Sequence, residues 1–155
     1  MAGDAPGGAV TIRECAGSSE YASLAAIWRS AVDATHDFLD PRDRDAIEAR
    51  LIPSYFPNVA LRVAEVDGGA GGFVGVADGK IEMLFVGAEL RGRGVGSALL
   101  ADALANGARQ VDVNEQNTQA VGFYESRGFA VVDRSGLDDA GRPYPILHMT
   151  YGAAR

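Results

Sequence analysis

Residues 81–97 contain the stretch that decides the fold: Ile81-Glu82-Met83-Leu84-Phe85-Val86, four connecting residues, then Arg91-Gly92-Arg93-Gly94-Val95-Gly96-Ser97. The first part predicts a strand, and the last part predicts a glycine-rich loop that opens a helix. Glycine lets the backbone adopt positive φ and approach a ligand closely. Successive amides at a helix N-terminus bind anions, and Arg91 and Arg93 add positive charge. The stretch therefore predicts a pyrophosphate site, without naming the ligand that carries the pyrophosphate.

Other interpretations of these glycines remain open at this point. A P-loop requires a lysine directly after its last glycine, whereas Ser97 follows Gly96. A Rossmann fingerprint requires G-x-G-x-x-G, and here the third glycine comes too early, although Asp112 stands twenty residues after Gly92, where a ribose-binding acid is expected. The antiparallel strands predicted before the loop also disfavour a doubly wound sheet. A glycine-rich turn that binds nothing is the remaining alternative.

Upstream of this stretch the chain predicts a strand, two helices and an antiparallel meander. Apolar residues at helical spacing follow Gly17, and Asp40-Pro41 has the N-cap and first-turn proline of a helix start. Asp67-Gly68-Gly69 predicts a hairpin whose loop extends to Gly72, and Asp78-Gly79 predicts a second hairpin. The expected elements are strand 10–13, a helix opened by residues 17–19, a helix from 41 to about 52 closed by Pro53 and Pro57, and strands 59–66, 73–77 and 81–86.

Downstream, helices alternate with strands. The expected elements are helix 95–104, strand 110–113, helix 118–127 starting on Asn117, and strands 129–134 and 145–151 separated by a loop at 136–141. The order is β-α-α-β-β-β-α-β-α-β-β. It indicates an α/β fold, a twisted mixed sheet of about seven strands with four helices packed on it. We expect a disordered tail over residues 1–9 and one domain over residues 10–151.

Composition excludes several classes of protein. The chain has 155 residues and a net charge of −7, which argues against a nucleic-acid partner and favours a cationic one. Cys15 is the only cysteine, and His36 and His148 lack the spacing of a helical metal pair, so we expect neither a disulfide nor a bound metal. The chain shows no signal peptide and no long apolar run, which predicts a cytoplasmic protein without a membrane partner.

Two motifs resemble the GNAT superfamily of acetyl-CoA-dependent acyltransferases. They are Arg91-x-x-Gly94-x-Gly96 and Asn117-x-x-Ala120-x-x-Phe123-Tyr124-x-x-x-Gly128-Phe129, at the family's spacing and in its element order over residues 10–151. Within the superfamily, residues 32–39, 113–117 and 142–145 are similar to the small bacterial YjaB-type N-acetyltransferases. The resemblance implies the GNAT fold, with a sheet that splays between Val86 and Val113, and acetyl transfer from the cosubstrate acetyl-CoA by direct attack of a primary amine.

The resemblance also implies a cofactor site. Backbone groups of Leu84, Phe85 and Val86 would bind the pantetheine arm. The pyrophosphate would lie on the loop residues Arg91, Gly92, Arg93, Gly94, Val95, Gly96 and Ser97. Asn117 would contact the cofactor from the next helix, together with Phe123 and Tyr124 on that helix. Asparagine is also an ordinary N-cap, so both roles are open for Asn117.

Two residues are the catalytic candidates. Tyr124 matches the family's tyrosine that protonates the departing thiolate, and an unperturbed pKa near 10 keeps such a phenol protonated. The alternative is that Tyr124 only packs against the sheet. Glu82 is the candidate base, because an amine with a lysine-like pKa of ~10.4 must lose a proton before it attacks. Strand alternation places Glu82 on the side of Leu84 and Val86, which the family turns toward the acceptor. The alternative is a solvated charge.

His36, Phe38 and Asn114 are the candidate acceptor-binding residues. His36 and Phe38 lie where the first two helices meet, which forms the acceptor wall in the superfamily, and Asn114 lies at the end of the strand before Asn117. His36 is also an alternative base. The acidic charge favours a small cationic amine as acceptor, and a protein lysine or N-terminus is the alternative. A non-catalytic acyl-CoA sensor is a further alternative from a different class. A homodimer is common in the family.

Overall fold

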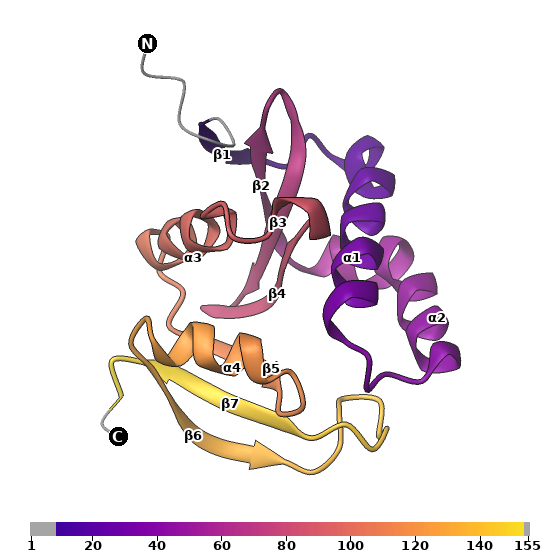
Figure 1. Ribbon diagram of the computed structural model, residues 1–155, viewed down its shortest axis with the longest axis vertical. Coiled ribbons are helices and arrows are strands. Elements are labelled where there is room, and N and C mark those ends of the chain that lie inside the picture. Colours follow the sequence, from indigo (N-terminus) through magenta and orange to yellow (C-terminus); the bar gives the residue numbers. More distant parts are fainter. Residues whose placement is uncertain (1–8, 154–155) are drawn as a thin grey trace.

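The structure, a computed structural model, describes residues 9–153, so the expected tail lies outside the described residues except for Ala9. Within these residues seven strands form one mixed sheet in the order β1-β2-β3-β4-β5-β7-β6, and the predicted order of strands and helices is confirmed (Figure 1). The strands are β1 (Val10–Glu14), β2 (Ala60–Val66), β3 (Gly69–Ala77), β4 (Lys80–Val86), β5 (Gln110–Asn114), β6 (Phe129–Ser135) and β7 (Ile146–Tyr151). The helices are α1 (Tyr21–Thr35), α2 (Pro41–Arg50), α3 (Val95–Ala105) and α4 (Thr118–Glu125).

The helices cover both faces of the sheet, and each face has its own apolar core. Figure 1 shows α1 and α2 together on one side and α3 and α4 on the other. Leu24, Trp28 and Val32 of α1 pack with Phe73 of β3 in one core. The other core contains the buried residues of α3 and Tyr124 of α4. In the part of the chain that the structure covers, no helix has both the length and the apolar character needed to cross a bilayer.

The hairpin between β2 and β3 is tighter than predicted. Asp67 and Gly68 have φ values of 54° and 83°, and Val66 pairs directly with Gly69. Two consecutive left-handed residues make a two-residue turn that matches the twist of the strands. The prediction of a loop extending to Gly72 is therefore wrong, and β3 begins at Gly69. A Cβ atom on Gly72 would lie 2.9 Å from the Phe85 carbonyl oxygen, so glycine allows the close packing here.

The segments around α1 and α2 also differ from prediction. Residues 18–20 form a 3₁₀ turn before α1, and α2 ends at Arg50 rather than about residue 52. The chain stays helical as a π turn (Leu51–Tyr55) and a 3₁₀ turn (Phe56–Asn58). Proline has no N–H to donate, so Pro53 interrupts the α-helical hydrogen bonds, although the backbone continues in helical turns. Burial of Leu51 and Phe56, at 1% and 0% exposure, holds this continuation against the core.

β4 and β5 separate soon after they meet. They pair in parallel at Lys80 with Gln110 and at Ile81 with Val111, and no further pair between these two described strands follows. Beyond this point β4 remains paired with β3, and β5 remains paired with β7. The predicted splay of the sheet is confirmed, and it positions the site described below.

We expect Phe73→Ala to lower the free energy of unfolding by about 3–5 kcal/mol, because it removes a fully buried ring. The ring lies 5.6 Å from that of Phe56 and 5.8 Å from that of Phe85, centroid to centroid. Urea denaturation measures the change. Val132→Ala is the control, since Val132 is 57% exposed and its truncation should change stability by less than about 0.5 kcal/mol. Equal effects of the two substitutions would contradict the assignment of this core.

Candidate active site

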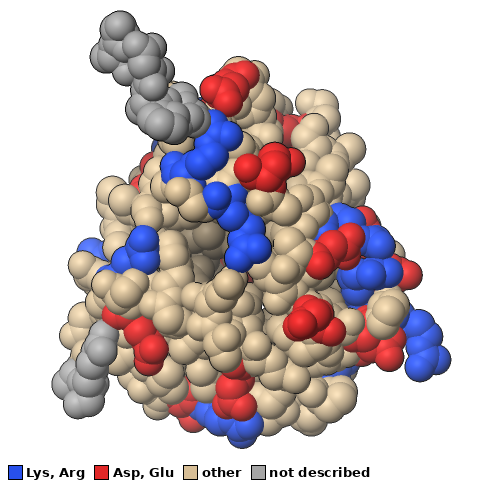
Figure 2. All heavy atoms as spheres, in the orientation of Figure 1, with Lys and Arg blue, Asp and Glu red and all other residues tan. Residues whose placement is uncertain are grey.

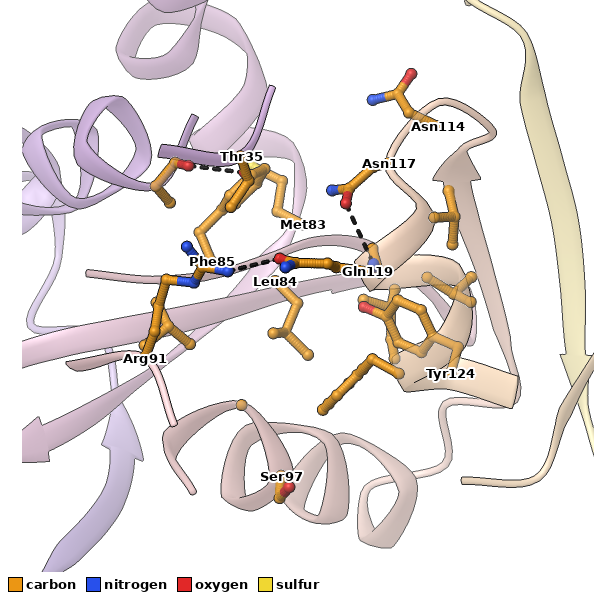
Figure 3. A pocket seen from close by; sticks show the side chains of 18 of the residues that line it. Thr35, Met83, Leu84, Phe85, Arg91, Ser97, Asn114, Asn117, Gln119 and Tyr124 are labelled. Carbon is orange, nitrogen blue, oxygen red and sulfur yellow. Dashed lines mark hydrogen bonds between the residues drawn. The ribbon is translucent and has the colours of Figure 1, made fainter. Parts of the chain in front are cut away.

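A cavity of about 660 Å³ lies between the separated strands, and we call it the first cavity. Figure 2 shows a hollow near the middle of this face, with Lys and Arg side chains gathered along its upper rim. Residues from β4, the loop before α3, β5 and α4 line the first cavity, as Figure 3 shows from close by. Sequence-predicted site residues in its lining are His36, Glu82, Leu84, Phe85, Val86, Arg91, Gly92, Gly94, Gly96, Ser97, Asn114, Asn117, Phe123 and Tyr124.

Three of the predicted residues do not line this cavity. The Arg93 guanidinium instead forms an ion pair with Asp67 of the β2–β3 turn, with 3.2 Å between nitrogen and oxygen. Val95 is 1% exposed and belongs to the core under α3. The Phe38 ring lies against that of His36, with their centroids 5.1 Å apart. Phe38 therefore contacts His36, a residue of the cavity lining, without lining the cavity itself.

The N-terminus of α3 faces the first cavity through its glycines. Gly92 and Gly94 both have φ of 81°, a left-handed conformation that glycine adopts without strain. Gly94 is the N-cap and offers no side chain to the amides of the first turn. Those amides lack partners within the helix, and the helix dipole adds positive potential there. This end of α3 therefore fits a pyrophosphate.

The edge of β4 offers a second type of backbone contact. Residues 83–86 pair with β3 on one side, and the described strands leave their other side unpaired after the separation from β5. Backbone N–H and C=O groups at such an edge are ready to pair with an amide-bearing chain. The edge therefore fits a pantetheine arm, which carries amides, and Leu84 and Phe85 lie there (Figure 3).

Tyr124 is buried at the foot of the first cavity. Its side chain is 6% exposed, and its ring packs edge-on against Phe123 and Phe129 at centroid distances of 5.1 and 5.4 Å. Figure 3 shows the hydroxyl directed into the cavity. Burial raises the pKa of the phenol above its ordinary value, because the charged form loses its hydration. Tyr124 is therefore a neutral hydrogen-bond donor at physiological pH.

Asn117 has the N-cap role that sequence analysis left open. Its Oδ1 accepts a hydrogen bond from the Ala120 amide at 3.2 Å, and α4 begins directly after it (Figure 3). The cap places Asn117 at the rim of the first cavity. Capping and a cofactor contact are compatible, because the cap uses only the side-chain oxygen.

A second cavity of about 420 Å³ opens on the other side of the separated strands. Carboxylates are prominent in its lining, and they include Asp138 and Asp139 of the β6–β7 loop. The first and second cavities have a common set of lining residues, which we call the shared wall: His36, Glu82, Met83, Phe85, Asp112 and Asn114. The two cavities are therefore adjacent, with this wall between them.

Glu82 reaches the shared wall because β4 is irregular at this position. Gly75 pairs with Met83 and Val76 pairs with Ile81, so Glu82 is the extra residue of a β-bulge. Glu82 lines the first cavity together with Leu84 and Val86, as alternation predicts, and it lines the second cavity as well, which alternation does not predict. Burial raises the pKa of the Glu82 carboxyl, and the Lys80 ammonium opposes this rise.

His36 is held as a neutral imidazole. The Thr35 hydroxyl donates to the Ala31 carbonyl at 2.8 Å, so its oxygen accepts from His36 Nδ1, also at 2.8 Å. This arrangement leaves Nε2 as the unprotonated nitrogen. Burial lowers the pKa of the ring. Its position on the shared wall keeps His36 as a second candidate base.

Several lining residues were missed by sequence reasoning. Gln119 accepts a hydrogen bond from Arg91 across the mouth of the first cavity, at 2.5 Å (Figure 3). Arg127 bonds the Ser97 hydroxyl at 2.6 Å and lies over the ring of Phe123. Gln119 and Arg127 lie within the second motif, between its matched residues, and this position could have indicated that they line the site. Asp138 and Asp139 gave no such signal, because they lie in a loop.

This geometry defines an acyltransferase, and comparison with known proteins agrees. Residues 26–145 match the family described as "Acetyltransferase (GNAT) domain". The chain belongs to the GNAT acetyltransferase family and is an acetyl-CoA-dependent N-acetyltransferase.

Named relatives cover most of the chain. The peptidyl-lysine N-acetyltransferase YjaB of Salmonella typhimurium (strain LT2) is 43% identical over 134 residues, which are 85% of this chain and 92% of the relative. YjaB of Escherichia coli (strain K12) is 44% identical over 138 residues, or 87% and 92%. The solution structure of apo YjaB from Escherichia coli has a TM-score of 0.85 at 39% identity and covers 94% of this chain and 99% of its own.

A structure with the cofactor also shares the fold. It is yncA of Salmonella typhimurium with acetyl-CoA, with a TM-score of 0.61 at 22% identity, covering 95% of this chain and 96% of its own.

Proposed function

We propose that residues 10–151 form a single domain that transfers an acetyl group from acetyl-CoA, in the first cavity, to the side-chain amine of a peptide lysine, in the second. The observation that carries this proposal is the shared wall, where the two cavities meet at Glu82. The expectations of a cytoplasmic location and of a homodimer stay predictions.

The first cavity supplies the groups that hold acetyl-CoA. Glycine amides at the start of α3 bind the pyrophosphate, with Arg91 and Arg127 at the rim. Backbone groups of residues 84–86 bind the pantetheine amides along the unpaired edge of β4. When bound, acetyl-CoA supplies an acetyl group activated as a thioester.

The second cavity suits a cationic acceptor. Glu82, Asp112, Asp138 and Asp139 line it together with Arg142, which pairs with Asp138 at 3.4 Å. The carboxylates outnumber this guanidinium, and the net negative charge attracts an ammonium group. A lysine ammonium with a pKa near 10.4 must lose a proton before its nitrogen attacks, and Glu82 accepts that proton directly or through one water. Two relatives at 43% and 44% identity are peptidyl-lysine N-acetyltransferases by name, which supports a peptide lysine over the small amine favoured by sequence analysis.

Tyr124 acts on the leaving sulfur. Burial keeps its proton on the hydroxyl oxygen, so the group enters the reaction as a donor. Since that burial raises the phenol pKa above 10 while a thiol has a pKa near 8.5, complete proton transfer to the sulfur is uphill. We assign Tyr124 the role of stabilising the developing thiolate by a hydrogen bond.

The acceptor is tested by thiol release from acetyl-CoA with lysine-containing peptides, peptides with a free N-terminus, and small polyamines, each with mass spectrometry of the product. We expect release with the lysine peptides and a mass increase on the lysine side chain. Thiol release with polyamines alone would show that the acceptor is a small amine and contradict the proposal of a peptide lysine. Acetyl-CoA binding without release for any amine would contradict catalysis and favour an acyl-CoA sensor.

We expect Tyr124→Phe to lower kcat at least about tenfold while leaving the Kd of acetyl-CoA nearly unchanged, because phenylalanine keeps the packing and loses only the donor. Stopped-flow or steady-state thiol release and calorimetry measure the two quantities. Tyr151→Phe is the control, since Tyr151 is 40% exposed and does not line the first cavity. Unchanged turnover at saturating substrate would remove Tyr124 from the mechanism.

We expect Gly94→Asp to weaken acetyl-CoA binding by about tenfold or more, because a carboxylate at the start of α3 repels a pyrophosphate. The matched control is Gly94→Asn, which has nearly the same shape, tolerates the left-handed conformation and carries no charge. No atom lies within 4 Å of a Cβ built at Gly94, so crowding within the protein is not the cause. Equal affinities of the two variants in calorimetry would show that the pyrophosphate binds elsewhere.

A further inference from the structure

Lys80, the only lysine in the chain, joins two carboxylates of the shared wall. Its Nζ lies 3.0 Å from Asp112 Oδ2 and 3.6 Å from Glu82 Oε2. Asp112 Oδ1 accepts a hydrogen bond from His148 Nδ1 at 2.8 Å, since a carboxylate has no proton to donate. His148 Nε2 in turn lies 2.7 Å from the Ser135 hydroxyl. The network therefore runs across β4, β5, β7 and β6.

The network lies at the point where β4 and β5 separate. Ile81 and Val111 form the last pair of the parallel ladder, so Glu82 and Asp112 are the first residues beyond it on each strand. Two carboxylates brought together at this point repel each other. The Lys80 ammonium contacts both and compensates that repulsion. It is 32% exposed, so it forms this contact without full burial.

We propose that Lys80 is a positioning residue for acetyl transfer. Asp112 and His148 hold its ammonium group in place, and the ammonium group keeps Glu82 ionised and directed toward the shared wall. This inference rests on the proposed function of Glu82 as the base. A lysine suits the role because its ammonium is a compact point charge, whereas a guanidinium favours one carboxylate in a fixed planar geometry.

The charges around Glu82 favour this role for Lys80. Burial raises the pKa of the Glu82 carboxyl first, and the charges of Asp112 and Asp139 raise it further. The Lys80 ammonium lowers it by its charge, from 3.6 Å away. His36 on the shared wall is held neutral by burial and adds no charge there. His148 faces Asp112 and not Glu82. Lys80 is thus the cation that opposes the protonation of Glu82.

The experiment compares the pH dependence of kcat/KM in the wild-type protein and Lys80→Met. A base must be unprotonated to act, so activity rises as pH passes the pKa of Glu82. Without Lys80 that pKa is higher. We therefore expect the acidic limb of the kcat/KM profile to move to higher pH by roughly 0.5–1 unit. At pH values below the pKa of Glu82, kcat/KM of Lys80→Met is then about 3–10-fold lower than that of the wild-type protein. At higher pH the two values become equal. NMR titration of ¹³C-labelled glutamate carboxyls should show the same shift for Glu82.

Matched variants separate electrostatics from structure. Lys80→Arg keeps the positive charge, so its acidic limb should lie close to that of the wild-type protein. Lys80→Gln repeats the test with a polar side chain if methionine impairs folding. Arg62→Met removes a similarly exposed cation, paired with Asp102 at 2.7 Å and absent from the lining of both cavities, and should leave the limb unmoved. An unmoved limb in Lys80→Met, or an equal loss of activity at every pH, would overturn the inference.

Glu82→Gln distinguishes this inference from the proposed function. If Glu82→Gln keeps wild-type activity and an acidic limb, Glu82 is not the base and the proposed function fails at that residue. If Glu82→Gln loses activity while Lys80→Met titrates as the wild type does, the proposed function stands and the inference about Lys80 fails.

Discussion

The separation of β4 from β5 is the constraint on which the rest of this molecule depends. Among the described strands these two share two residue pairs, and then each continues with a different partner. Backbone groups past the last pair need hydrogen-bond partners, and one edge of β4 is left to find them outside the sheet. The same separation makes room for two cavities with a shared wall. A regular ladder between β4 and β5 would satisfy the backbone and remove the site.

The charges are arranged unequally about this separation. The first cavity has Arg91 and Arg127 at its rim, together with the uncapped start of α3. The second cavity is lined by four carboxylates, Asp139 among them, and by the guanidinium of Arg142. A net charge of −7 is compatible with an anionic cofactor because the local field at a helix start, and not the total charge, acts on a pyrophosphate. This arrangement supports the proposal that the first cavity binds the anionic cofactor and the second cavity a cationic acceptor.

The residues of the first cavity were largely predictable from sequence, and those that only the second cavity contains were not. The glycine loop, the start of α3 and the motif on α4 are local patterns, and local geometry places Gly94 and Asn117 where the patterns imply. The bulge at Glu82 depends on the register between β3 and β4, which alternation along one strand cannot reveal. Asp112 was noted only as a ribose-binding acid, because its contact with Lys80 requires the pairing of β4 with β5. The loop carboxylates Asp138 and Asp139 reach the second cavity by tertiary packing alone.

Burial acts differently on the two groups proposed to handle protons, Tyr124 in the first cavity and Glu82 on the shared wall. It disfavours the charged form of each group and so raises the pKa of both Tyr124 and Glu82. For a phenol that must keep its proton and donate, this effect serves the chemistry, and Tyr124 is packed among rings with apolar surroundings. For a carboxylate base, a higher pKa strengthens the base but lowers the ionised fraction at pH values near and below that pKa. The buried tyrosine therefore stays a donor without a charged neighbour, whereas the more exposed Glu82 has the Lys80 ammonium beside it, which favours its ionised form.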